Sequence, residues 1–151
     1  MHTYYAAYAA VFAALYAAHY VGDHWVQTND QALAKGGPGW TGRLACARHV
    51  ASMTITKVIC LTLTAGITGI PLVPWHAAAG LALDAASHYW ADRRSTLARL
   101  AARTGKSGYY ALGAPRPGHD DNVTTGTGAF HLDQAFHIAC LWAAVLIIAA
   151  P

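Results

Sequence analysis

Histidine and aspartate recur at a spacing of four residues in three apolar stretches of this chain. The members of these rows are His19, Asp23, Asp84, His88, Asp92, Asp133 and His137. Residues four apart share one helix face, so each row would present an imidazole and a carboxylate together. Helical bundles build internal metal sites from two such ligands per helix. The rows therefore predict a metal site, and His49 is a further candidate ligand.

A mixed set of nitrogen and oxygen ligands suits zinc best, and iron or manganese as alternatives. A metal with an open coordination position activates water for attack on an ester or a phosphate. An aspartate near that water can act as the general base, and Asp23 and Asp92 are the candidates. Surplus carboxylates can hold a second metal or orient the histidines through hydrogen bonds. Gln27 and Gln134 are expected to orient a ligand or the substrate.

Two readings without a metal compete with this one. A histidine and an aspartate can form a structural hydrogen bond across helices, or a chain of such groups can conduct protons. Lys57 lies in the middle of an apolar stretch, and pairing with an aspartate would favour a metal-free network.

The composition indicates a membrane protein. Hydrophobic residues make up 55% of the 151 residues and charged residues only 11%, against roughly 25% charged residues in a soluble domain. The formal net charge is +3, but the cations flank apolar runs instead of alternating with aromatic residues on one face. We therefore expect a lipid partner and no nucleic-acid partner.

Four stretches are long enough to span a bilayer, which takes about 20 helical residues. Unsatisfied backbone in lipid leaves helices or closed barrels, and no period-2 alternation suggests a barrel. The expected fold is a single all-α transmembrane domain over residues 1–151, an integral membrane four-helix bundle. The helices are expected at about 4–26, 44–67, 74–103 and 129–149.

The connections between these helices differ in charge. A polar loop is expected over 27–43, an uncharged turn over 68–74, and a long loop over 104–128 that contains His119, Asp120 and Asp121. The first and third connections, with the adjoining helix ends, carry nine of the ten Lys and Arg residues. The positive-inside rule then makes both of them cytoplasmic and leaves both termini outside the bacterial inner membrane. In that topology all the rows lie at similar depth in the cytoplasmic half.

The segment from His19 to Lys35 carries a resemblance. It reads His-Tyr-Val-Gly-Asp-His-Trp-Val-Gln-Thr-Asn-Asp-Gln-Ala-Leu-Ala-Lys. It resembles an uncharacterised family of small bacterial and phage integral membrane proteins, which opens with His-x-x-x-Asp-x-x-x-Gln-Thr-Asp followed shortly by Lys. That family also has a histidine at the start of its second helix, a later helical aspartate, and Asp-Gln-x-x-His near its end. The corresponding residues here are His49, Asp84 with His88, and Asp133-Gln134-Ala-Phe-His137.

The resemblance implies a membrane fold without an established activity, and Asn29 departs from the family pattern. A fainter likeness runs to membrane-bound metal-dependent hydrolases. The leading hypothesis is a hydrolase that acts on a lipid or another phosphate-bearing amphiphile at a cytoplasmic-facing divalent metal site. The alternatives are a transporter of metal ions or protons, and a non-enzymatic phage or host membrane protein with a structural metal. Small residues such as Gly80 and Ala85 are compatible with a homo-oligomer.

Overall fold

The computed structural model describes residues 2–114 and 126–150, and over these residues the chain is helical with no strands. The predicted positions His119, Asp120 and Asp121 lie outside the described residues. The elements in chain order are α1 (His2–Val21), the π-helix η1 (Gly22–Val26), α2 (Asn29–Ala34), α3 (Gly39–Thr68), α4 (Pro74–Asp92), α5 (Ser95–Arg103), α6 (Ser107–Tyr110) and α7 (Gly128–Ile148). The prediction of an all-α fold is confirmed for this part of the chain.

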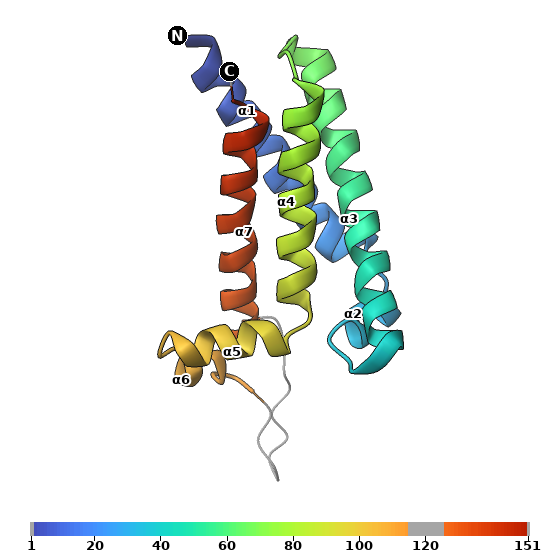
Figure 1. The fold of residues 1–151 in the computed structure, drawn as a ribbon, viewed down its shortest axis with the longest axis vertical. Coiled ribbons are helices and arrows are strands. Elements are labelled where there is room, and N and C mark those ends of the chain that lie inside the picture. The colour runs from blue at the N-terminus through green and yellow to red at the C-terminus, as the bar shows by residue number, and fades with distance from the viewer. Residues whose placement is uncertain (1, 115–125, 151) are drawn as a thin grey trace.

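The four long helices form a closed ring in which α1 packs on α3, α3 on α4, α4 on α7 and α7 on α1. The two termini lie at the same end of this ring as the connection between α3 and α4 (Figure 1). The short helices α2, α5 and α6 lie at the opposite end, and α5 runs across the ends of the long helices. We refer to these as the terminal end and the loop end.

The outward faces of the long helices are apolar. On α3 the side chains of Ile55, Ile59, Leu63 and Ile67 are all exposed. By length and composition, α3 and α7 could each cross a membrane, and only 17% and 33% of their most apolar windows are buried inside the protein. These two helices therefore do not resemble the buried core helix of a soluble protein.

The interior at the terminal end is also apolar. Its buried residues are Val11, Leu15, Leu61, Leu141, Val145 and Ile148. They come from α1, α3 and α7, and partly buried side chains of α4 such as Leu81 pack against them. Hydrophobic burial therefore stabilises this half of the ring.

The helix predicted over 74–103 is in fact two helices. Its first part ends at Asp92, and Arg94 has a φ of 52°, in the left-handed region that few side chains other than glycine adopt. This residue redirects the chain, so that the amphipathic part forms α5 across the loop end. The sequence showed the change from an apolar to a basic pattern but not the break.

The connection predicted as a loop over 27–43 contains α2 and the first turn of α3. Thr28 and Gln31 form a capping box, because the Gln31 N–H donates to the Thr28 hydroxyl and the Thr28 N–H donates to the Gln31 side chain. The Thr-x-x-Gln spacing is the sequence signal of such a box and marks the start of a helix, which the prediction of a loop over 27–43 did not include. The turn predicted over 68–74 is confirmed, since α3 ends at Thr68 and α4 starts at Pro74.

Helices α4 and α7 approach each other closely at Gly80. A Cβ built on Gly80 would overlap the Ile148 side chain and lie 2.7 Å from the carbonyl oxygen of Ala144. Gly80 therefore lets the two backbones approach to a distance that any side chain would prevent.

We predict that Gly80→Ala lowers the free energy of unfolding by about 1–3 kcal/mol, the range for forcing extra atoms into a packed interior. The matched control is Gly66→Ala on α3, where an added Cβ would meet nothing within 4 Å. That variant should gain up to about 1 kcal/mol from helix propensity. Thermal unfolding followed by circular dichroism measures both, and equal midpoints would refute the close approach of α4 and α7.

Candidate metal centre

Six ionisable side chains from all four long helices meet inside the loop-end half of the ring. They are His19, Asp23, His49, His88, Asp92 and His137. The four histidines and Asp92 are at most 2% exposed, and the Asp23 side chain is 7% exposed. The three predicted rows and His49 thus contribute to one buried cluster, which we call the His/Asp cluster.

His49 of α3 and His88 of α4 form the middle of the cluster. Their Nε2 atoms are 3.0 Å apart. An oxygen of Asp23 lies 3.0 Å from the His49 Nε2 and 3.6 Å from the His88 Nε2. An oxygen of Asp92 lies 3.3 Å from each of the same two nitrogens. A carboxylate therefore approaches this histidine pair from each of two helices.

Asp23 reaches the cluster because α1 changes its winding. At Gly22 the helix becomes a π-helix, and the Gln27 N–H donates to the Gly22 carbonyl five residues earlier at 3.0 Å. A Cβ on Gly22 would overlap the sulfur of Met53, so the missing side chain lets this segment lie against α3. Single π-helical turns often occur at functional sites. The residue pattern did not predict this one.

Lys35 is a contact that the sequence analysis did not assign to the site. Its ammonium group lies 3.0 Å from the Oδ1 atom of Asp92, while Oδ2 faces the histidines. The Arg93 guanidinium donates to the carbonyl of Lys35 at 2.6 Å and so holds the Lys35 backbone beside α4. The sequence signal for Lys35 was its place shortly after the Gln-Thr motif, in the segment that carries the family resemblance.

The two predicted glutamines lie at the loop end of the cluster. Gln134 of α7 donates from Nε2 to the Oδ2 atom of Asp23 at 3.2 Å, which agrees with the predicted orienting role. Gln27 makes no such contact with the cluster, but it lines the same cleft as Asp23.

Asp133, which was predicted as a ligand, lies beside His137. Its side chain is 26% exposed, and its Oδ2 atom is 3.4 Å from the Nδ1 atom of His137. A carboxylate at this nitrogen would leave Nε2 of the imidazole to bind a metal. This position suits a residue that orients His137, and the prediction of Asp133 as a ligand stays a prediction.

Asp84 was also predicted as a ligand, and its position gives it a different partner. The Lys57 ammonium donates to both oxygens of Asp84, at 2.8 and 2.6 Å, and both residues are buried. This ion pair joins α3 to α4 one turn from His88. The pairing of Lys57 with an aspartate, which the sequence associated with a metal-free network, is thus present. It lies outside the six residues of the His/Asp cluster.

A cleft of about 710 Å³ opens onto the cluster at the loop end. Asp23 and Asp92 line it together with the cations Lys35 and Arg94. Its apolar lining consists of Ala32, Leu33, Leu97, Ala129 and Phe130. The volume lies within the range of pockets that bind small molecules.

The geometry of the cluster fits a divalent metal. A tetrahedral zinc ion with bonds of about 2.0–2.1 Å places its ligand atoms about 3.3 Å apart. The distance between Nε2 of His49 and Nε2 of His88, and the four distances from these nitrogens to the oxygens of Asp23 and Asp92, all lie between 3.0 and 3.6 Å. Buried polar atoms without a hydrogen-bond partner also gather here, including both ring nitrogens of His19 and of His137. Such atoms are rare in proteins unless a ligand or water satisfies them.

Comparisons of the chain with models of protein families, with curated proteins and with solved structures find no match. The family resemblance of the His19–Lys35 segment therefore stays a prediction, and the function has to be argued from the site itself.

We predict that Lys57→Met lowers the free energy of unfolding by about 3–5 kcal/mol, because it leaves the Asp84 carboxylate buried without a partner. The double variant Lys57→Met/Asp84→Leu removes both charges and should recover most of this loss. Chemical denaturation of the wild type, both single variants and the double variant measures the coupling. A double variant as unstable as Lys57→Met would show that Asp84 has a role beyond the ion pair.

Proposed function

We propose that this chain is an integral membrane hydrolase with a divalent metal, most favourably zinc, bound by His49, His88 and Asp23. Its substrate would be a lipid or another phosphate-bearing amphiphile. The proposal is carried by one observation, the mutual 3.0–3.6 Å spacing of the His49 and His88 nitrogens and the Asp23 carboxylate, which itself lines an amphipathic cleft.

The distribution of apolar residues supports a membrane location. The ring is apolar outside and polar in its interior at the loop end, which is the reverse of a soluble bundle. In water, the exposed apolar face of α3 would associate with other apolar surfaces. Exposed Trp25 and Trp40 lie towards the loop end and Trp75 lies at the terminal end, as in the aromatic belts of a membrane protein. We infer that α1 and α4 span the bilayer together with α3 and α7.

The orientation follows from charge. The basic residues of α5 and of the segment from Lys35 to Arg48 lie at the loop end, opposite the termini. The positive-inside rule then puts the loop end and the cleft in the cytoplasm, and both termini outside the bacterial inner membrane.

We predict that alkaline phosphatase fused to the C-terminus of the full chain is active in bacteria. A green fluorescent protein fused at the same residue should stay dark, because it does not fold when exported by the general secretory route. The two fusions are each other's control. A bright fluorescent fusion with an inactive phosphatase fusion would invert the topology, and a soluble fusion protein would refute the membrane location.

The residues of the cluster divide into binding and proton-accepting groups. A divalent metal between His49, His88 and Asp23 would lower the pKa of a bound water and polarise the substrate. Asp92 lines the cleft, and its Oδ2 atom has no hydrogen-bond partner in the protein. We assign it as the base that accepts the proton of the attacking water. The oxygen of that water would bond to the ester phosphorus or carbon as the ester bond breaks, and Asp92 would pass the accepted proton to the leaving oxygen.

The cleft suits an amphiphile with an anionic headgroup. Arg94 and Lys35 bring positive charge to a cavity whose other walls include Leu33, Leu97 and Phe130. Cations of this kind attract phosphate groups, and the apolar walls can contact the start of an acyl or isoprenoid chain.

Transport across the membrane is less well supported. A path for ions would have to continue from the His/Asp cluster to the terminal end. Among the residues that the structure describes, the buried positions in that half are the apolar ones such as Leu15, Leu61 and Leu141. The arrangement therefore favours a site that opens on one side only. Action through contact with another membrane protein, and a homo-oligomer, stay as predictions.

We predict that the purified protein contains zinc, iron or manganese and releases product from a panel of phospholipids and lipid phosphates. His88→Ala removes a central ligand and should lower the rate by more than about 100-fold, since loss of a residue behind a ligand already costs 10- to 100-fold in metal affinity or activity. The matched control is His131→Ala, which removes an exposed histidine of α7.

Equal product release by the wild type and His88→Ala would remove the basis of the hydrolase proposal. Bound metal in the wild type without product from any member of the panel would leave the metal in a structural role.

A further inference from the structure

We infer that the His/Asp cluster holds two metal ions, with the Asp23 carboxylate as the bridge between them. The first position is the one between His49 and His88, so this inference rests on the proposed function. The second position is formed by His19 of α1, His137 of α7 and the remaining oxygen of Asp23.

The two oxygens of Asp23 face different histidines. Oδ1 lies 3.0 and 3.6 Å from the Nε2 atoms of His49 and His88. Oδ2 lies 3.5 Å from the Nε2 atom of His19, on the other side of the carboxylate. Each oxygen of this carboxylate therefore lies near a different set of histidine nitrogens. This is the arrangement of a bridging ligand, as in the paired-metal centres of helical bundles.

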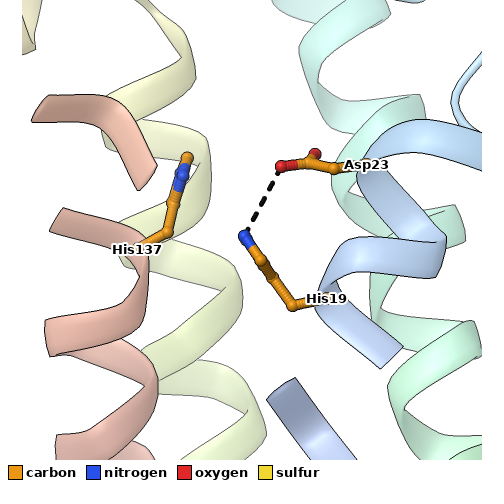
Figure 2. A group of neighbouring side chains, drawn as sticks. All are labelled: His19, Asp23 and His137. Carbon is orange, nitrogen blue, oxygen red and sulfur yellow. Dashed lines mark ion pairs between the residues drawn. The ribbon is translucent and has the colours of Figure 1, made fainter. Parts of the chain in front are cut away.

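His19 and His137 have a carboxylate nearby at 3.5 and 3.4 Å, but neither ring makes a hydrogen bond. Figure 2 shows both side chains and Asp23 pointing into the space between α1 and α7. His19 is fully buried and His137 is 2% exposed, and none of their four ring nitrogens has a hydrogen-bond partner. One ligand atom from each of the three residues lies within 4.8 Å of the others. Because buried imidazoles are rarely left unsatisfied, a ligand at this position is the most direct account of them.

The residues behind this position hold its ligands in place. The Oδ2 atom of Asp133 lies 3.4 Å from Nδ1 of His137, so this carboxylate can restrain the ring and leave Nε2 to bind a metal. Gln134 donates to Oδ2 of Asp23 at 3.2 Å and so restrains the bridging carboxylate from its α7 side. The Asp-Gln-x-x-His sequence on α7 thus supplies one ligand and two residues that orient ligands.

His137 could also serve the first position, since its ring stacks on His88 with centroids 4.0 Å apart and Asp92 is nearby. That arrangement would leave His19 without a metal to bind, although His19 is among the most deeply buried side chains that the structure describes. Two positions use all four histidines. Ions about 3.5–4 Å apart can stabilise the attacking and the leaving oxygen of a displacement together, which suits a phosphate ester.

The test is metal stoichiometry by elemental analysis of the purified full chain after incubation with Zn²⁺ and removal of free ion. We expect two zinc ions per wild-type chain and one in His19→Ala, with His131→Ala as the matched control at two. Electron paramagnetic resonance of the Mn²⁺-loaded wild type should show an exchange-coupled pair, and His19→Ala an isolated ion.

If His19→Ala does not fold, His137→Ala is measured in its place. The number of zinc ions bound by the wild type tests the second position even if neither variant folds. One zinc ion in the wild type overturns the second position and leaves the proposed hydrolase site intact. Two ions in both the wild type and a folded His19→Ala overturn the assignment of His19. No zinc in the wild type overturns this inference and the proposed function together.

Discussion

Burial of imidazoles and carboxylates in the same interior is the constraint on which this structure depends. Apolar packing at the terminal end holds the four long helices together, but the loop-end half must satisfy six ionisable side chains away from water. Isolated charges there would be very unfavourable, so each must find a partner of opposite charge, a hydrogen bond or a metal. The helices are therefore held in register by polar chemistry at one end and by hydrophobic contact at the other.

The Lys57–Asp84 pair separates these two regions. It is fully buried, joins α3 to α4, and lies between the apolar core and His88. A buried ion pair adds little to stability by itself, but it penalises any other alignment of the two helices strongly. The pair thus helps to set the relative height of His49 and His88, whose Nε2 atoms have to come within 3.0 Å.

Much of the site could be predicted because spacing alone encodes a helix face. His19 with Asp23 and His88 with Asp92 were identified as rows, and the structure brings these rows together with His49 and His137. The predicted helix positions also agree closely for α1 with η1 and for α7. These features depend on periodicity and hydropathy, which are local properties of the chain.

The features that could not be predicted depend on tertiary contacts. The sequence indicated that Lys57 could pair with an aspartate, but not that the partner would be Asp84 of another helix. The positive φ of Arg94 ends α4 although the residue pattern would allow the helix to continue. The π-helical turn at Gly22 depends on contact with Met53. At Asp84 and at Gly22 a neighbour distant in sequence is in contact with the residue concerned.

The hydrogen bond between Asp23 and Gln134 joins residues 111 positions apart, at the two ends of the chain. During synthesis, α1 is complete long before α7 leaves the ribosome. Until then His19 and Asp23 lack their α7 partners, so the polar interior can close only once α7 has been made. The docking of α7 should be a slow step in folding, because contacts between distant parts of a chain slow folding.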